Sequence, residues 1–213
     1  MKRREFLTSS LAAGVAFGFP ALVSARSPNA KVCHACIGTH GMAGADMRTF
    51  AGFKDLLDVV AVCDVDAAYL AEAKKLLPNA RVYRDWRELL AAEGDRIDAV
   101  NVSTPDHTHT IISANAMRRG KHVYCQKPLC KKLDECRLLR RLAAETGVTT
   151  QLGTQFASGL GDRQIVAFLQ QGVIGPVTRV CLYSTRNGMS RVRRVLEAPA
   201  PVPANLDWEG WVG

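Results

Sequence analysis

Short apolar runs alternate with amphipathic segments through residues 31–152, and this pattern leaves few folds open to the chain. An amphipathic segment between two strands is expected to be a helix that crosses over the sheet, so successive strands run parallel. The runs are nearly continuous in apolar residues, as in a sheet that is covered on both faces. We therefore predict an α/β domain with a doubly wound parallel sheet over residues 30–153.

The expected strands are 31–37, 59–63, 81–83, 99–102, 122–125 and 148–152. The expected helices are 44–56, 66–77, 86–92 and 108–119, and a further helix that is capped by Asp134 and ends at Gly147.

The pattern changes after residue 153. A helix is expected at 162–171, followed by a turn at 172–176 that contains glycine and proline. Residues 177–186 then alternate between apolar and polar side chains, which predicts a strand with one exposed face. Prolines at alternate positions of 198–203 predict an extended linker. We expect residues 154–213 to begin a second α/β domain with an open sheet.

Residues 1–25 have the features of a bacterial export signal. Arg3 and Arg4 form a twin arginine in a positively charged start, an apolar stretch follows at 7–23, and Val23-Ser24-Ala25 offers small residues to a signal peptidase. An N-terminal anchor and a general secretory signal are the alternatives. The twin arginine favours an exported, periplasmic protein that uses the twin-arginine export machinery.

Two classes of protein are excluded by the sequence as a whole. No run of about 20 apolar residues is present, so we expect no integral membrane bundle and no stable membrane insertion. The net charge is +8, but the basic residues are scattered and are not interleaved with aromatic residues. Such residues are expected on solvated helix faces, and we predict no nucleic-acid partner.

The seven cysteines are an odd number, so they cannot all pair internally. Cys33 and Cys36 have a spacing found in metal and redox sites, but they fall in a predicted strand, where residues three apart point to opposite faces. Cys63, Cys125 and Cys181 also fall in apolar, strand-like runs. We interpret these cysteines as buried small hydrophobic residues and predict no metal site.

A glycine-rich turn joins the first predicted strand to the first predicted helix. In dinucleotide-binding folds this turn holds the pyrophosphate on backbone N–H groups at the positive end of the helix. The example here is imperfect, because a histidine stands at the second glycine position, and glycine turns also occur for purely geometric reasons. The candidate cofactor-binding residues of the turn are Gly38, His40, Gly41, Met42 and Ala43.

Asp64 ends the second predicted strand, where a carboxylate can accept hydrogen bonds from the ribose hydroxyls of adenosine. Val65 and Asp66 follow it, so a 2′-phosphate would meet negative charge at this position. This favours NAD over NADP as the cofactor. The alternative is that Asp64 caps the next helix, a role better suited to Asp66.

A polar loop, Ser103-Thr104-Pro105-Asp106-His107-Thr108-His109, follows the fourth predicted strand. Ligands of open α/β sheets bind beyond the carboxyl ends of the strands, and this loop reaches that edge. Its two histidines suggest a metal site, but no clustered Asp, Glu or Cys completes a ligand set. We predict that the loop contacts the cofactor and caps the next helix; its candidate cofactor-binding residues are Ser103, Thr104, Asp106, His107 and His109.

Lys127 follows the fifth predicted strand and precedes Pro128. An ammonium group at this edge could hydrogen-bond a substrate hydroxyl and stabilise the negative oxygen that develops as hydride leaves the neighbouring carbon. An exposed structural lysine is the alternative. Lys127 is the candidate catalytic residue.

Taken together, the motifs resemble the Gfo/Idh/MocA family of oxidoreductases, which includes glucose–fructose oxidoreductase and inositol dehydrogenase. The matching motifs are the glycine turn, Cys63-Asp64-Val65-Asp66, the 103–109 loop, Gly120-Lys121-His122-Val123-Tyr124-Cys125-Gln126-Lys127-Pro128 and Asp207-Trp208-Glu209-Gly210-Trp211-Val212-Gly213. The resemblance implies an N-terminal Rossmann domain, a C-terminal domain with a large open sheet, and a homo-oligomer formed through that sheet. It also implies that Lys127 reaches the substrate and that the cofactor is lined by Met42, Ala43, Asp64, Asp106, His107, His109, Gln126, Lys127 and Gln155.

The chain departs from the family pattern in two places. Gln126 stands where the family usually has a glutamate before its lysine. Family members also continue past the tryptophan-rich turn at 208–211, and their acid/base aspartate and histidine, on a helix of the second domain, have no counterpart here. We therefore expect this sequence to be a C-terminally truncated form of a longer protein.

The expected function is NAD-dependent hydride transfer to or from a sugar, a cyclitol or a related polyol. NAD-dependent cleavage of a glycoside on the same fold is a second hypothesis. A non-catalytic nucleotide-binding or sugar-sensing protein is a third, motivated by Gln126 and the missing acid/base pair.

Overall fold

The computed structural model describes residues 31–181, 183 and 200–213. Its strands are β1 (Val32–Ile37), β2 (Leu57–Cys63), β3 (Arg81–Tyr83), β4 (Ala99–Val102), β5 (His122–Gln126) and β6 (Thr150–Gly153). Its helices are α2 (Met42–Gly52), α3 (Ala67–Leu76), α4 (Trp86–Glu93), α5 (His109–Arg118), α6 (Leu133–Thr146), the 3₁₀ helix η1 (Gln155–Ser158), α7 (Leu160–Gln170) and α8 (Trp208–Val212). The export signal predicted at 1–25 lies outside the described residues.

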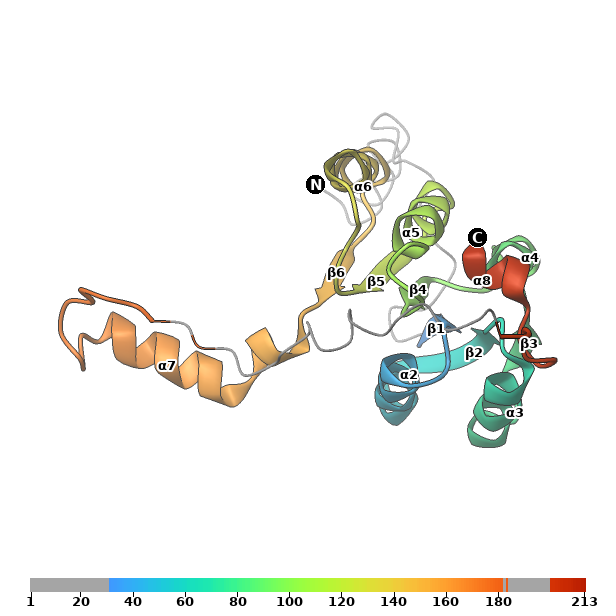
Figure 1. Cartoon of the computed structure of the whole chain (residues 1–213), viewed down its shortest axis with the longest axis horizontal. Helices are drawn as coiled ribbons and strands as arrows, with labels where there is room; N and C mark the ends of the chain where they lie inside the picture. The colour runs from blue at the N-terminus through green and yellow to red at the C-terminus, as the bar shows by residue number, and fades with distance from the viewer. Residues whose placement is uncertain (1–30, 182, 184–199) are drawn as a thin grey trace, which may run out of the picture. The chain divides into compact units, whose positions relative to one another are not determined.

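The six strands form one parallel sheet in the order β3-β2-β1-β4-β5-β6 (Figure 1). The order reverses at β1, which has β2 on one side and β4 on the other. The central strands end side by side, because Ile37 pairs with both Cys63 and Val102. Ligands of open α/β sheets bind beyond such a reversal, so the ends of β1 and β4 mark the expected site. The predicted doubly wound parallel sheet is confirmed.

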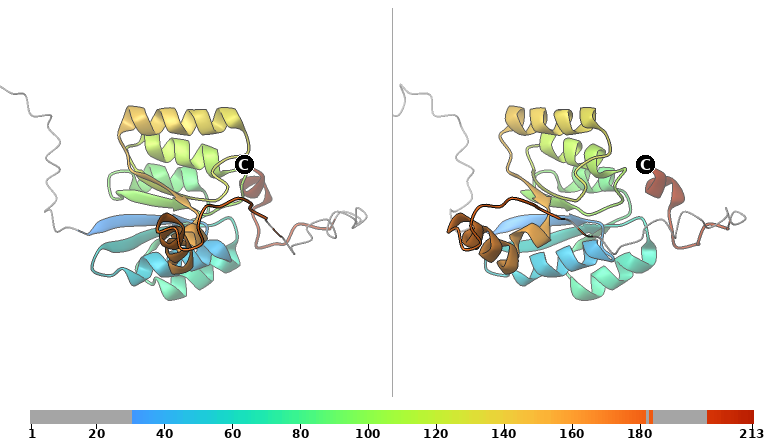
Figure 2. Two further views of the ribbon diagram at one scale, coloured as in Figure 1. Left: turned by 90° about the vertical axis from the view of Figure 1, so that its left-hand side faces the viewer. Right: turned by 60° about the vertical axis from the view of Figure 1, so that its left-hand side comes forward.

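Helices cover both faces of the sheet (Figure 2). On one face, Met47 of α2 and Leu70 of α3 join Val62 in a buried cluster. On the other face, Leu90 of α4 and Ile112 of α5 belong to a larger buried cluster to which α6 also contributes. Successive strand residues point to opposite faces, so the nearly continuous apolar strands supply both clusters.

The segment between α2 and β2 differs from the prediction. The sequence predicts a helix over 44–56, but the helix begins at Met42 and ends at Gly52, and β2 already begins at Leu57. The carbonyl of Leu56 accepts a hydrogen bond from the N–H of Val32 at 3.0 Å. Residues 54–56 form a turn, and the sheet begins directly after it, where Leu57 pairs with Val32.

Carboxylates stabilise the first turns of two helices. Asp66 caps α3 as predicted, because it accepts hydrogen bonds from two backbone N–H groups of the first turn. The prediction that Asp134 caps α6 is wrong, because Lys132 is the N-cap residue. The carboxylate of Glu135 instead reaches back to the N–H groups of Lys131 and Lys132 at 2.9 and 3.1 Å.

The strand predicted at 177–186 is not found in the described part of that segment. Residues 177–181 form no regular structure and pair with none of the described strands, and residues 182 and 184–186 lie outside the description. A strand needs a neighbour for its N–H and C=O groups, whatever its side-chain pattern. Cys181 is exposed, which corrects the prediction that it is buried.

The helix predicted at 162–171 is present as α7, and none of its residues is buried. No described helix has both the length and the apolar character required to span a membrane. The described part of the linker predicted at 198–203, residues 200–203, has neither helix nor strand. The division into domains at residue 153 stays a prediction.

Candidate cofactor site

A cleft of about 580 Å³ opens at the carboxyl edge of the sheet, around the ends of β1, β2 and β4. This is the point at which the strand order reverses. Half of the predicted cofactor residues line the cleft, namely Gly38, His40, Met42, Ala43, Asp64, Ser103 and Thr104. The other half lie outside its lining, namely Gly41, Asp106, His107, His109, Gln126, Lys127 and Gln155.

The glycine turn between β1 and α2 has the form of an anion cradle. Gly38 has a φ of 94°, and a Cβ atom on it would lie 2.5 Å from the backbone oxygen of Ser103. Gly41, with a φ of 59°, immediately precedes Met42, the first residue of α2. The first turn of α2 contains no acidic residue. Backbone N–H groups at such a helix end bind phosphate oxygens, so the turn fits the pyrophosphate of NAD.

Asp64 lies just past the end of β2, and its side chain is part of the cleft wall. Its Oδ2 accepts hydrogen bonds from the N–H and the hydroxyl of Thr39, at 2.8 and 2.9 Å. Its Oδ1 accepts one from the N–H of Asp66 at 3.1 Å. A carboxylate oxygen has two lone pairs, so Oδ1 retains an acceptor position for a ribose hydroxyl.

His40 occupies the position at which the dinucleotide fingerprint has a glycine. Its ring stacks on the ring of Tyr69 in α3, with centroids 3.9 Å apart and 5° between the planes. Both residues line the cleft. The stacking directs the imidazole toward α3, so the turn accommodates a side chain at this position.

The C-terminal segment forms one wall of the cleft, through Pro203, Leu206, Gly210 and Trp211. Leu206 pairs with Asp66 in an isolated antiparallel bridge. The amide of Asn205 donates to both carboxylate oxygens of Asp66, at 2.8 Å each. The residue that caps α3 therefore also anchors the C-terminal wall.

The aromatic end of this wall rests on the 103–109 loop. A ring nitrogen of His107 lies 2.8 Å from the carbonyl oxygen of Trp211, and the two rings are 5.2 Å apart. The ring of Trp208 stacks on Trp211, also at 5.2 Å. His107, which the sequence predicts as a cofactor contact, thus binds the C-terminal wall.

His109 ties two loops together. Its Nδ1 lies 2.6 Å from the carbonyl oxygen of Pro128, and its Nε2 lies 2.7 Å from that of Thr104. Asp106 is exposed. The predicted capping of α5 by this loop needs correction, because the N-cap residue is Thr108 and its side chain makes no capping hydrogen bond.

The end of β5 carries a buried glutamine followed by an exposed lysine. Gln126 donates from Nε2 to Asp46 at 2.9 Å, and its Oε1 accepts the N–H of Lys127 at 3.1 Å. Gln155 also donates to Asp46, at 3.3 Å. Lys127 is joined to Pro128 by a cis peptide bond. Among the described residues its ammonium group has no hydrogen-bond or ion-pair partner, so it is free to meet a ligand.

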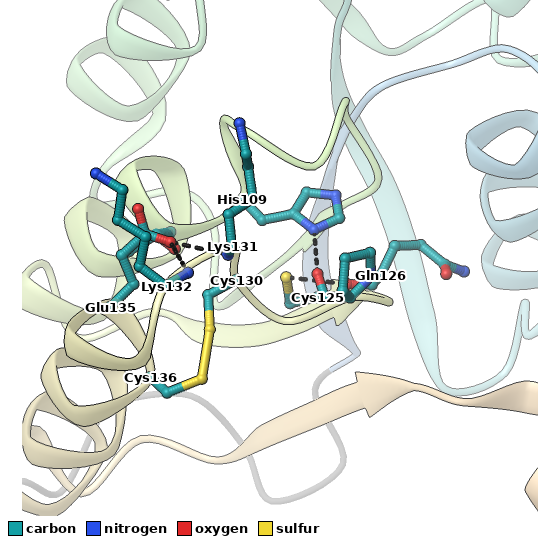
Figure 3. Close-up of a disulfide and its surroundings, with 10 residues drawn as sticks. His109, Cys125, Gln126, Cys130, Lys131, Lys132, Glu135 and Cys136 are labelled. Atoms are coloured by element: carbon teal, nitrogen blue, oxygen red, sulfur yellow. Dashed lines mark hydrogen bonds between the residues drawn. A yellow bond between two sulfur atoms is a disulfide. The ribbon is translucent and has the colours of Figure 1, made fainter. Parts of the chain in front are cut away.

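A disulfide joins Cys130 to Cys136 and links the segment after β5 to α6 (Figure 3). Glu135 binds the same segment through the N–H groups of Lys131 and Lys132. The sequence did not predict this disulfide, because an odd cysteine count leaves the pairing open. Two links, one covalent and one polar, therefore hold the segment that follows β5.

Cys36, Cys63 and Cys125 are buried, as predicted. Burial raises the pKa of the Cys36 and Cys63 thiols, and it raises the pKa of Cys125 to about 11. These thiols are therefore protonated at neutral pH and act as small apolar side chains. No group of three His, Cys, Asp or Glu side chains in the described part of the chain is placed to hold a metal ion.

The cleft also contains residues that the sequence did not identify, among them Thr39, Tyr69, Arg84, Trp86 and Trp211. Thr39 lies inside the recognised glycine turn. The signal available for it was a hydroxyl side chain just after β1, together with a carboxylate, Asp64, just after the neighbouring β2. The other side chains come from α3, from the region of β3 and α4, and from the C-terminal wall. Their positions in the cleft depend on how these distant segments pack together, which the local sequence does not show.

Comparison with known proteins agrees with this geometry. The model of the oxidoreductase family with an NAD-binding Rossmann fold matches residues 33–154. An inositol 2-dehydrogenase of Burkholderia multivorans is 31% identical over 144 residues, which are 66% of this chain and 41% of that protein. A glycosyl hydrolase family 109 protein of Shewanella pealeana is 28% identical over 130 residues, which are 57% of this chain and 28% of that protein. The chain thus spans less than half the length of these curated relatives.

Solved structures share the fold. The crystal structure of scyllo-inositol dehydrogenase from Lactobacillus casei, with bound NAD(H) and scyllo-inositol, superposes with a TM-score of 0.64 at 23% identity. The match covers 70% of this chain and 44% of the other.

Proposed function

Because the chain belongs to the oxidoreductase family with an NAD-binding Rossmann fold, we propose that it serves the NAD-dependent oxidation or reduction of a sugar, a cyclitol or a related polyol. NAD is its cofactor, and the residues of the cleft fit the adenosine and pyrophosphate parts of NAD. The inositol 2-dehydrogenase among the relatives supports the polyol substrate class.

One arrangement carries the proposal: Asp64 and the glycine turn lie on one side of the strand-order reversal, and Lys127 lies on the other. The two halves of a doubly wound sheet each receive one half of a dinucleotide. The half that contains β1 and β2 holds the adenosine and pyrophosphate groups through Gly38 and Asp64. Lys127 follows β5 in the other half, where the nicotinamide and the substrate belong.

NAD supplies the hydride acceptor or donor of the reaction. We assign to Lys127 the substrate oxygen, because its ammonium group is exposed and unpaired among the described residues. A positive charge at that oxygen lowers the energy of the negative charge that develops as hydride leaves the adjacent carbon.

The compartment that we propose is the periplasm, reached through the twin-arginine route. Arg3 and Arg4 in the first 25 residues support this proposal, and so does the disulfide between Cys130 and Cys136. Disulfides persist mainly in oxidising compartments, and the periplasm is one of them. We propose that the protein is a homo-oligomer, as the family resemblance implies.

The test is a fluorescence titration of the purified chain with NADH, followed by absorbance assays of NAD reduction with a panel of inositols and sugars. We expect saturable NADH binding and turnover of at least one polyol. Lys127→Met should abolish turnover and change the NADH dissociation constant by less than about threefold, because the lysine acts on the substrate oxygen. Binding without turnover of any polyol, in a protein that also carries the acid/base aspartate and histidine of the family, would favour a nucleotide-binding protein that is not an enzyme.

A second candidate function is NAD-dependent glycoside cleavage, which the family 109 relative supports. The two functions differ in their redox balance. Glycoside cleavage of this kind oxidises the substrate transiently and then reduces it again, so it releases no net NADH, whereas a dehydrogenase does. Release of a sugar from an aryl glycoside without net NADH would favour the glycosidase.

A further inference from the structure

Asp46 is a buried carboxylate in α2 that no motif identifies, with 7% of its surface exposed. Among the described residues it has no cationic partner. Three neutral donors approach it instead: Ser103 Oγ at 2.8 Å, Gln126 Nε2 at 2.9 Å and Gln155 Nε2 at 3.3 Å. A buried charge is stable only when its lone pairs are satisfied, and hydrogen bonds to a charged group are the strong ones.

The three donors come from three different parts of the carboxyl edge. Ser103 follows β4, Gln126 is the last residue of β5, and Gln155 follows β6 in η1. The sequence predicts all three as cofactor residues, and each donates to Asp46. One carboxylate therefore connects the second half of the sheet to α2, the helix whose N-terminus faces the cleft.

A chain of hydrogen bonds that begins at the buried ring of His34 also ends at Asp46. Burial lowers the pKa of His34 to about 4, so its ring is neutral at pH 7. The His34 Nε2 lies 3.0 Å from Asn101 Oδ1, and Asn101 Nδ2 donates to Ser103 Oγ at 3.0 Å. The Ser103 hydroxyl then donates to Asp46 at 2.8 Å. Because the amide nitrogen of Asn101 faces Ser103, its oxygen accepts from His34, and every hydrogen bond in the line runs toward Asp46.

Gln126 connects Asp46 to the backbone of Lys127. With its amide nitrogen on Asp46, its oxygen accepts the N–H of Lys127 at 3.1 Å. Glycine at position 153 leaves room for this side chain, because a Cβ atom there would lie 3.0 Å from its Cδ. A glutamate at position 126 would place a second carboxylate about 3 Å from Asp46, where two like charges repel in a buried site. The presence of Asp46 thus explains why this chain has glutamine at 126.

We propose that Asp46 is a positioning residue of the cofactor site, which holds Ser103, Gln126 and Gln155 in place and, through Gln126, fixes the backbone at Lys127. This inference rests on the proposed NAD-dependent function. Asp46 acts by accepting hydrogen bonds, so its partner at 126 must be a donor.

The test is a donor–acceptor exchange between positions 46 and 126 in the whole chain. Gln126→Glu places two acceptors face to face, and the double variant Asp46→Asn/Gln126→Glu restores one donor and one acceptor with the roles reversed. Gln151→Glu, on the exposed surface of neighbouring β6, is the matched control for the added charge. NADH dissociation constants are measured by fluorescence at about pH 8 and about pH 6, with thermal unfolding in parallel.

At pH 8 we expect Gln126→Glu to weaken NADH binding by about tenfold or more, since a hydrogen bond to a charged group is lost. The double variant should recover part of the lost affinity, because positions 46 and 126 pair again while Ser103, which donates to the same Oδ2 of Asp46, loses its acceptor. Gln151→Glu should bind NADH as the wild type does. At pH 6 the binding of Gln126→Glu should improve, because a proton held between the two carboxyl groups restores a donor.

The outcomes separate the two hypotheses. A wild-type chain that binds no NADH overturns the proposed function. A wild-type chain that binds NADH, with a Gln126→Glu variant that binds equally well at both pH values, overturns the role of Asp46 alone. In a third outcome, Gln126→Glu binds NADH weakly at both pH values and the double variant recovers no affinity. Position 126 would then matter only for packing, and the proposed role of Asp46 would again be overturned.

Discussion

The carboxylate of Asp64 accepts two hydrogen bonds from Thr39, one from its N–H at 2.8 Å and one from its hydroxyl at 2.9 Å. Thr39 directly follows Gly38 in the turn that faces the cleft. The candidate ribose acceptor therefore also fixes the candidate phosphate cradle. Changes at Asp64 are expected to affect both parts of the cofactor site.

Replacing Asp64 with alanine removes the ribose acceptor and the anchor of the turn. We expect the free energy of NADH binding to weaken by about 1–3 kcal/mol, the cost of leaving polar partners unpaired. Thr39→Val removes only the hydroxyl bond and should have a smaller effect. Isothermal titration calorimetry of the three proteins checks the order, and unchanged affinity in Asp64→Ala would show that the carboxylate does not bind the ribose.

Gly38→Ala tests the cradle itself. The added methyl group would lie 2.5 Å from the backbone oxygen of Ser103, and the φ of 94° is unfavourable for any side chain. We expect the free energy of unfolding to fall by about 2–4 kcal/mol, from strain and overpacking together. Gly52→Ala, at the end of α2, meets no atom within 4 Å and serves as the control. Urea unfolding of both variants measures the difference, and equal stabilities would contradict the close approach.

Local patterns in the sequence were sufficient to predict the sheet and the places of the glycine turn and of Asp64 at the ends of its strands. A strand end, a helix start and a carboxylate between them are features of neighbouring residues, and the fold places them where the pattern indicates. The predicted end of α2 was wrong because it depends on a contact with a residue outside the segment. Leu57 pairs with Val32 in the sheet, and this contact joins residues that are too distant in the chain for a local pattern to indicate.

The parts that could not be predicted join residues that are distant in the chain. Asp46 meets Gln126 across 80 positions, and Asn205 meets Asp66 across 139 positions. No periodicity encodes these contacts, because each depends on the order in which strands assemble in the sheet. The loop that contains His107 lines the cleft, but no local pattern indicates that His107 contacts Trp211. The cofactor contact of His107 stays a prediction.

Asn205 is expected to hold the C-terminal wall against the cleft. In Asn205→Ala both hydrogen bonds to Asp66 are lost, and Trp211 should become more exposed. We expect a red shift of tryptophan emission and NADH binding that is weaker by about 1 kcal/mol, since one wall of the site is loosened. Asn115→Ala is the control, because Asn115 is a half-buried asparagine of α5 whose side chain bonds only to Ile111 and Arg119. Unchanged emission and affinity would show that the wall is held by its other contacts.

The disulfide between Cys130 and Cys136 is expected to stabilise the segment that follows β5. It closes a loop with a sequence separation of 6, for which chain entropy gives about 2 kcal/mol. Replacing both cysteines with serine, or adding a reductant to the wild type, should lower the free energy of unfolding by about that amount. The reductant should have no further effect on the double variant. Any additional loss there would point to one of the other cysteines.

The buried ring of His34 predicts how stability depends on pH. Burial lowers its pKa to about 4, and the hydrogen bond with Asn101 opposes this shift only in part. In the unfolded chain the same ring has its ordinary pKa of about 6.5. Between these values the unfolded state binds a proton that the folded state excludes. The free energy of unfolding therefore rises with pH across this window, by up to about 3 kcal/mol from this group.

His34→Gln keeps a donor for Asn101 but does not titrate, so its stability should vary less with pH between about 4 and 6.5. Urea unfolding at several pH values in this window, and at pH 7, measures the slope for both proteins. His122→Gln is the control, because His122 is exposed and the variant should retain the slope of the wild type. An identical slope in His34→Gln and the wild type would mean that the folded state also protonates this ring. In that case the ring of His34 would be charged in the folded state, while its Nε2–H would still donate to Asn101.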